Sequence, residues 1–177
     1  SAPIPISATT TVKYRSWDVA GNAEAVNSRL VTVDAAAPVT SILCNGNPCS
    51  ANGYTTAPQV SFTSTDVNGL GVASTHYTTD GTDPTLSSPT YSQPFPVTTT
   101  TTVKFRSWDN AGNVEATQSQ VVLVDGTPPV TTISCNGTAC KSTGYTTAVS
   151  VTLSAADATG GSGLASTHYT TDGTDPT

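Results

Sequence analysis

The residues of this chain that could act as acids, bases or nucleophiles are few, and most lie in turn-forming sequences. His76 and His168 are the two histidines, and they occupy equivalent positions of a repeated ten-residue sequence. A nucleophilic triad would need an aspartate and a suitably placed serine around each histidine, in every copy of the repeat. Asp80 and Asp83 form a carboxylate pair, but in Asp-Gly-Thr-Asp-Pro such residues cap the N–H groups of a turn. We therefore predict that the protein is not an enzyme.

Aspartates on turns also offer the oxygen ligands that calcium prefers. Asp66, Asp80 and Asp83 lie at the ends of predicted strands, and Asp34 lies at a proline-containing joint. Asp66, Asp80 and Asp83 are therefore candidate calcium ligands. The alternative is that they only form turns, since the chain has no EF-hand spacing and no aspartate-dense nonapeptide. No other cofactor is predicted.

The four cysteines form two copies of the spacing Cys-x4-Cys, Cys44 with Cys49 and Cys135 with Cys140. Two chemistries compete for them. Structural zinc sites more often use Cys-x2-Cys pairs. The residues between these cysteines are turn formers, with Asn-Gly in both copies. A disulfide within each copy fits better, and it implies an oxidising, extracellular compartment.

Alternation along residues 102–109 predicts a strip of side chains that point away from the core. Successive side chains of a strand point to opposite faces, so Val103 and Phe105 are expected to face inward. The preceding strand is expected to turn His76 outward. The outward-facing set is His76, Lys104, Arg106 and Trp108. Two interpretations stay open: cation–π packing over the indole ring, and a contact surface for a glycan or a neighbouring copy of the chain.

All these residues lie in stretches of sequence that recur along the chain. Thr11–Asp18 returns as Thr102–Asp109, 91 positions later, and both cysteine pairs follow the same shift. After Asp66 the shift becomes 92, and it holds through His168–Thr177. A fixed period of this kind indicates an array of structural units. We predict residues 1–33 as the C-terminal part of a first unit, 34–124 as a complete unit and 125–177 as the N-terminal part of a third.

Short runs of β-branched and aromatic residues, separated by turn signals, predict an all-β unit. The chain shows no sustained helical spacing of apolar residues. The expected strands of the complete unit are Val39–Leu43, Pro58–Thr65, Ala73–Thr79, Tyr91–Val97, Thr101–Trp108 and Val114–Val124. About seven short strands in such a unit are typical of an immunoglobulin-like β-sandwich. We therefore predict tandem immunoglobulin-like β-sandwich domains.

The composition of the chain limits the classes of partner that it can bind. The chain carries 6 basic and 12 acidic residues, a net charge of −6, which argues against nucleic acid or an anionic membrane as a partner. It contains no apolar run long enough to enter a membrane as a spanning helix. Asn136-Gly137-Thr138 matches an N-glycosylation sequon, whereas the equivalent Asn45-Gly46-Asn47 does not.

Two groups of motifs resemble known extracellular modules. Tyr77–Thr85, followed by Pro94–Val97 and Thr102–Lys104, resembles the chitobiase/β-hexosaminidase C-terminal-type module. Trp108–Glu115 is similar to the closing Asp-x-Ala-Gly-Asn motif of bacterial immunoglobulin-like repeats. The resemblance implies a sandwich fold in a secreted or cell-surface setting, with a role as spacer, stalk or accessory domain. It supplies no catalytic residue, and it does not include the cysteine pair.

These observations predict a non-catalytic structural repeat of an extracellular prokaryotic surface protein: a stalk, an adhesin shaft or a filament. The alternative is a carbohydrate-binding or spacer module of a secreted polysaccharide-degrading enzyme. Half of a β-sandwich exposes apolar faces and unpaired strand edges, which is costly. We therefore expect each partial unit to be completed by flanking repeats of the same chain or by a neighbouring copy, as in a homopolymer.

Overall fold

The protein is all-β, as the sequence predicts. The computed structural model describes residues 2–177, in which ten strands and no helix are present. No part of this range therefore provides a helix that could cross a membrane. The strands are β1 (Thr10–Tyr14), β2 (Asn27–Val31), β3 (Val39–Cys44), β4 (Gln59–Thr65), β5 (Val72–Thr78), β6 (Phe95–Pro96), β7 (Thr101–Asp109), β8 (Gln118–Val122), β9 (Val130–Cys135) and β10 (Val151–Ala156).

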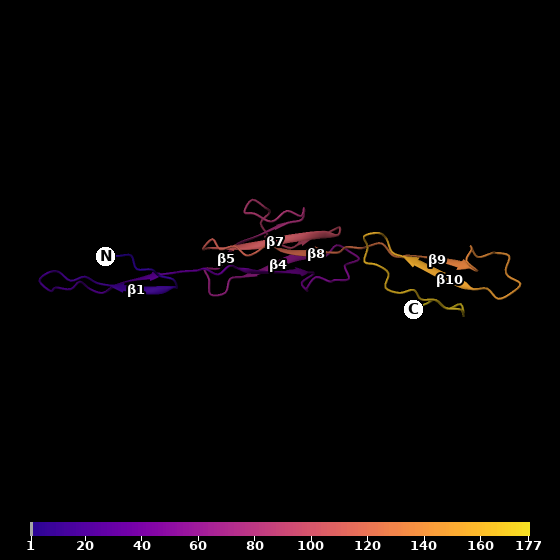
Figure 1. The fold of residues 1–177 in the computed structure, drawn as a ribbon, viewed down its shortest axis with the longest axis horizontal. Helices are drawn as coiled ribbons and strands as arrows, with labels where there is room; N and C mark the ends of the chain where they lie inside the picture. Colours follow the sequence, from indigo (N-terminus) through magenta and orange to yellow (C-terminus); the bar gives the residue numbers. More distant parts are fainter. Residues whose placement is uncertain (1) are drawn as a thin grey trace. The chain divides into compact units, whose positions relative to one another are not determined.

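The strands form four small sheets, with the orders β1-β2, β3-β4-β6, β5-β7-β8 and β10-β9 (Figure 1). The two three-stranded sheets lie within residues 34–124, the predicted complete unit. Their six strands each overlap one of the six strands named from the sequence. Tyr91–Val97, expected to be a full strand, contributes only Phe95–Pro96. Pro94 and Pro96 lack the N–H groups that a longer ladder would need.

Contacts between residues divide the chain into two compact units. The first holds the residues up to Ser41, together with 62–92 and 104–119; the second holds 42–61, 93–103 and 120–177. Strands β3, β4, β7 and β8 contribute residues to both units. The division at residues 34 and 125 stays a prediction from the sequence repeat.

The first unit is organised by the antiparallel ladder between β5 and β7. Its register pairs Thr75 with Ser107 and Tyr77 with Phe105. The Phe62 ring packs against Phe105 with centroids 4.9 Å apart, and against Tyr77 at 5.9 Å and Tyr91 at 5.0 Å. Contacts at these separations are favourable for aromatic pairs. Phe62 and Phe105 are buried, so this aromatic cluster is the apolar core of the unit.

The second unit contains both disulfides. Cys44 is bonded to Cys49 and Cys135 to Cys140, which confirms the predicted pairing and leaves no free thiol. In each loop an asparagine adopts positive φ, Asn45 at 52° and Asn136 at 50°. The side-chain Oδ1 of each asparagine accepts a backbone N–H from the following strand region, that of Gln59 or Ser150. Equivalent sequences therefore build the same loop twice, because asparagine tolerates the left-handed region and bonds the backbone locally.

Candidate functional site

A buried polar cluster joins the two three-stranded sheets of residues 34–124. The hydroxyl of Ser107, on β7, lies 2.6 Å from that of Thr40 on β3 and 2.7 Å from that of Thr75 on β5. The Ser64 hydroxyl on β4 lies within 3.0 Å of all three. A hydroxyl is both donor and acceptor, so four of them can satisfy one another inside the protein.

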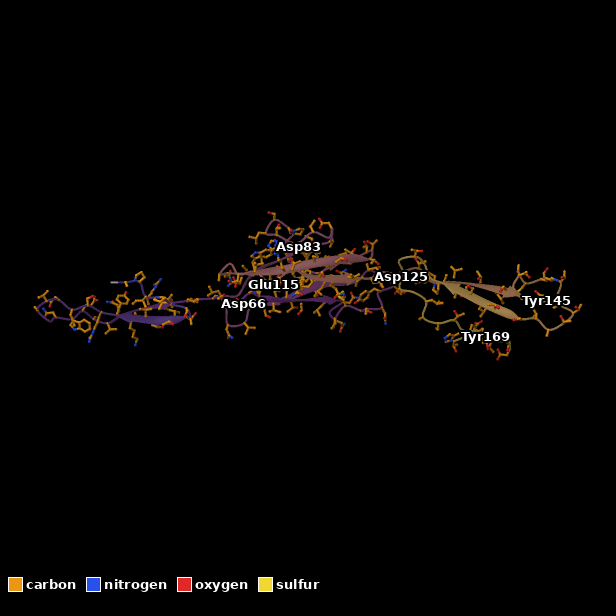
Figure 2. The ribbon with its side chains drawn as sticks, viewed as in Figure 1. Asp66, Asp83, Glu115, Asp125, Tyr145 and Tyr169 are labelled. Carbon is orange, nitrogen blue, oxygen red and sulfur yellow. A yellow bond between two sulfur atoms is a disulfide. The ribbon has the colours of Figure 1, made fainter. Side chains whose placement is uncertain are left out.

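Glu115 completes this cluster from the turn between β7 and β8. Its carboxylate accepts the backbone N–H of Ser107 at 2.7 Å and that of Thr40 at 3.0 Å (Figure 2). The residue is 7% exposed, so its charge is held by hydrogen bonds rather than by water. Glu115 is not among the site residues predicted from the sequence. It ends the closing motif Trp108–Glu115, but the motif does not indicate that β3 supplies the second N–H donor to its carboxylate.

The cluster holds the serine, threonine and acid that hydrolytic chemistry would need, but it is closed to substrates. Ser107 is 0% exposed, and its hydroxyl contacts only other hydroxyls of the cluster. A nucleophile must reach the atom it attacks, within about 3 Å in a near-attack geometry. The arrangement therefore ties two sheets together and offers no reaction site.

The predicted outward strip lies on the opposite face of β7. Lys104, Arg106 and Trp108 are half-buried, whereas the alternating residues of the strand are buried. The Arg106 guanidinium lies 4.8 Å from the centroid of the Trp108 ring, a cation–π contact. Lys104 forms an ion pair of 2.8 Å with Asp83, which holds the pKa of the Asp83 carboxyl below its ordinary value.

The prediction that His76 faces solvent is wrong. It is 4% exposed, because residues 85–91 lie along the free edge of β5 and cover the histidine. One ring nitrogen of His76 is hydrogen bonded to the Ser88 carbonyl at 2.8 Å, and the other lies 3.1 Å from the Ser74 hydroxyl. Its ring also meets the Trp108 ring edge to face, with centroids 5.2 Å apart. The strip is therefore a packed layer of side chains.

The predicted calcium ligands do not come together as a set. Among residues 2–177, three carboxylates gather within 4.8 Å of one another, those of Asp34, Asp66 and Asp109. Only Asp66 belongs to the predicted trio. Asp83 pairs with Lys104, and Asp80 accepts hydrogen bonds from Thr82 in its own turn.

Five of the six oxygens in this aspartate cluster already accept hydrogen bonds. Asp34 accepts the N–H groups of Ala36 and Leu70, and Asp66 accepts that of Gly71. Asp109 accepts two backbone N–H groups and the side-chain amide of Asn113. The remaining oxygen, Oδ1 of Asp66, is buried without a partner among the described residues. The three aspartates thus accept N–H groups from three turns, and these turns meet at the proline-containing joint beside Asp34.

The same joint recurs along the chain. Asp125, equivalent to Asp34, accepts the Ser162 N–H at 2.7 Å, and Asp157, equivalent to Asp66, accepts that of Gly163 at 2.6 Å. Asp18, equivalent to Asp109, accepts the backbone and side-chain N–H groups of Asn22 at 2.8 Å. These bonds lower the pKa of the Asp125 and Asp18 carboxyls. The repeated sequence therefore reproduces the turn chemistry of the joint.

The segments outside residues 34–124 contain repeats of residues that are buried or half-buried within 34–124, and in these segments the repeated residues are exposed. Trp17, equivalent to Trp108, is 59% exposed and keeps only its cation–π partner Arg15, at 4.5 Å. Tyr169, equivalent to Tyr77, is 72% exposed. It lines an open apolar groove of about 640 Å³ together with Ile133 and Leu153.

Part of the chain is similar to a known protein family. Residues 50–119 match the family model described as the chitobiase/beta-hexosaminidase C-terminal domain. The match confirms the predicted resemblance for this stretch, and with it an immunoglobulin-like fold. In chitobiase this C-terminal domain is a non-catalytic accessory module. No curated protein and no solved structure matches the chain.

The two tryptophans give a test of whether the strip is a packed layer. We expect Trp108→Ala to lower the free energy of unfolding by about 2 kcal/mol, since the half-buried ring packs against His76 and Arg106. Trp17→Ala is the matched control and should cost less than about 1 kcal/mol, because the exposed ring keeps only a cation–π contact. Urea unfolding followed by circular dichroism measures both. Equal losses in the two variants would contradict the packed layer.

The aspartates predict how stability changes with pH. Burial raises the pKa of Asp109, but hydrogen bonds from Asn113, Ala111 and Gly112 outweigh it, so the pKa is below its ordinary value. A carboxyl of this kind stabilises the fold above its unfolded pKa of about 3.9, and the contribution is lost as the pH falls through its folded pKa.

We therefore expect the free energy of unfolding to stay constant from pH 7 to about pH 5 and to fall below about pH 4. Asp109→Asn should be less stable at pH 7, because the Asn113 amide loses an acceptor, and should lose less on acidification. Asp18→Asn makes the same change in the exposed hairpin and serves as control. An Asp109→Asn variant with the acid response of the parent protein would exclude this origin.

Proposed function

We propose that the protein is a non-catalytic structural segment of an extracellular surface protein, built from immunoglobulin-like units in tandem. The observation that carries the proposal is the repeated joint and disulfide loop. Asp34 and Asp125 cap equivalent turns, and the Cys44–Cys49 and Cys135–Cys140 loops share one construction. A scaffold made of repeated units needs the same connection at each step, whereas a binding site needs to be built only once.

Three further features support this role. Ser107 and Glu115, the residues nearest to catalytic chemistry, are buried in a closed hydrogen-bond cluster. Disulfides are stable in oxidising compartments, which favours the outside of the cell. The match of residues 50–119 to an accessory-type module is compatible with the same location.

The alternative, a carbohydrate-binding or spacer module of a secreted polysaccharide-degrading enzyme, has one specific observation in its favour. The family match is to a module named for carbohydrate-processing enzymes. In addition, Tyr14 and Trp17 are 55% and 59% exposed, and exposed aromatic rings are suited to stacking on sugars. Under this alternative, we expect the glycan site at Tyr14 and Trp17, on the hairpin formed by β1 and β2, and not at Trp108.

Retention on insoluble polysaccharides separates the two functions. We expect no depletion of the protein from solution by chitin, cellulose or peptidoglycan, because a structural segment needs no glycan contact. Trp17→Ala and Trp108→Ala are assayed beside the unmodified chain. Retention that is lost in Trp17→Ala and kept in a folded Trp108→Ala would overturn the structural proposal in favour of the accessory module.

The structural proposal requires no bound metal ion. Since five of the six carboxylate oxygens of the aspartate cluster accept N–H donors, we expect the melting temperature to be the same in excess EDTA and in millimolar calcium. Differential scanning calorimetry measures it. A drop in EDTA that calcium restores and magnesium does not would instead place calcium at Asp34, Asp66 and Asp109. Asp66→Asn, which removes the unpartnered carboxylate charge, should then abolish the calcium effect.

A further inference from the structure

Tyr54 lies between the first disulfide loop and the residues that lead out of the predicted unit 34–124. Its hydroxyl accepts the backbone N–H of Ser50, the residue next to Cys49, at 2.8 Å. The disulfide from Cys49 to Cys44 fixes that part of the loop to the end of β3. The loop therefore sets the position of the Tyr54 side chain.

The backbone of Tyr54 is hydrogen bonded to the outgoing chain. Its N–H donates to the Leu123 carbonyl at 3.0 Å, and its carbonyl accepts the Asp125 N–H at 2.8 Å. The two bonds flank Val124, which forms a parallel bridge with Tyr54. One residue is thus bonded to the disulfide loop through its side chain and to residues 123–125 through its backbone.

Gly53 makes this close contact possible. Its φ is +82°, and a Cβ atom at this position would lie 2.8 Å from Cγ of Leu123 and 3.1 Å from the Leu123 carbonyl oxygen. Glycine adopts such a φ readily and has no Cβ to collide with the outgoing chain.

Thr100 bonds the outgoing chain on its other side. Its hydroxyl donates to the Val124 carbonyl at 3.1 Å and accepts the Val124 N–H at 3.0 Å. Successive residues of an extended chain direct their backbone groups to opposite sides, so Thr100 and Tyr54 hold residues 123–125 between them. Thr9 makes the same two bonds to Val33.

Asp125 connects this contact to the joint. Its backbone N–H is bonded to Tyr54, and its carboxylate accepts the N–H of Ser162 at 2.7 Å and that of Thr127 at 3.0 Å. A continuous path of bonds therefore runs from the disulfide loop through Tyr54 and Asp125 to the turn at Ser162.

The second copy of the loop orients its tyrosine in the same way. Tyr145 is the equivalent of Tyr54, and its hydroxyl accepts the Lys141 N–H at 3.0 Å. Lys141 replaces Ser50, but the donor is a backbone group, so the bond does not depend on the side chain. Within residues 2–177 no β-bridge involves Tyr145, yet the bond to Lys141 is made. The loop therefore positions its tyrosine without help from a paired strand.

We propose that the Cys44–Cys49 loop is a latch for the joint between sequence repeats: it positions Tyr54, and Tyr54 holds Asp125 where its carboxylate caps the turn at Ser162. Tyr54 is a positioning residue of this connection. The inference rests on the proposed function, because it gives the repeated disulfide loop and the repeated joint one shared structural role.

Amide hydrogen exchange followed by NMR tests the latch. In a Cys44→Ser, Cys49→Ser variant, we expect the protection factor of the Asp125 amide to fall about tenfold, because loss of the disulfide releases Tyr54. The Asp109 amide, bonded to the Asn113 carbonyl away from this path, should keep its protection.

The Asp125 carboxyl gives a second measurement, at the joint itself. Hydrogen bonds from Ser162 and Thr127 hold its pKa below the ordinary value. In the Cys44→Ser, Cys49→Ser variant this pKa should rise toward that value, as measured by NMR titration. A loop that stabilised only its own turn would leave the pKa of Asp125 unchanged.

The other disulfide supplies the matched control. A Cys135→Ser, Cys140→Ser variant opens the equivalent loop, which makes no hydrogen bond to residues 123–125 in the described part of the chain. The exchange rate of the Asp125 amide and the pKa of its carboxyl should therefore stay as in the parent protein.

Tyr54→Phe tests the same path with both disulfides intact. It removes only the hydroxyl that accepts the Ser50 N–H, and we expect about a threefold loss of protection at the Asp125 amide. An unchanged Asp125 amide in a folded variant of either kind would overturn the proposal, and so would a Tyr54→Phe variant that loses protection equally at Asp109. If the Cys44→Ser, Cys49→Ser variant does not fold, Tyr54→Phe alone decides.

Failure of the latch and failure of the proposed function are distinguishable. Polysaccharide retention that is lost on Trp17→Ala would overturn the structural function and would leave exchange at Asp125 unaffected. Exchange at Asp125 that ignores the loop would overturn the latch and would leave the retention result unaffected.

Discussion

The antiparallel ladder between β5 and β7 is the interaction on which the internal packing of residues 34–124 depends. It sets Thr75 opposite Ser107 in the hydroxyl cluster and Tyr77 opposite Phe105 in the aromatic core. On its other face it brings His76 to the Trp108 ring. Where the same two sequences occur without each other, in β1 and in residues 164–170, Trp17 and Tyr169 are exposed. The same sequence is therefore buried where its antiparallel partner strand is present, and exposed where no partner strand is described.

Several polar side chains of residues 34–124 are buried, among them those of Thr40, Thr75, Ser107 and Glu115. Ser107 and Thr40 hydrogen bond directly between strands of different sheets, and the Glu115 carboxylate bridges the backbones of the same two strands. Hydrogen bonding offsets the cost of burying these hydroxyl groups. Ser107 and Glu115, residue types that hydrolases use, are buried in this cluster.

The joint and the disulfide loop are the two devices that the chain repeats most faithfully. At the joint, an aspartate accepts the backbone N–H of a residue far along the chain, as in Asp34 with Leu70 and Asp125 with Ser162. In the loop, a short covalent closure fixes the turn at the end of β3 and of β9. The disulfide loop acts locally, between cysteines five positions apart, whereas the joint bonds residues that are 36 and 37 positions apart. The sheets also need strands that are distant in the sequence, as where β5 pairs with β7.

The sequence by itself determined the local and periodic features: the all-β class, the cysteine pairing, the turns capped by aspartate, and the alternation that buries Phe105 and turns Trp108 away from the core. Each depends on neighbouring residues or on strand periodicity, which a sequence displays directly. Only the tertiary structure decided that His76 is buried under residues 85–91, that Glu115 bonds β3, and that Asp34, Asp66 and Asp109 share one cluster. The residues of these contacts are separated by up to 75 positions, and no local pattern records which distant strand or loop will lie against which.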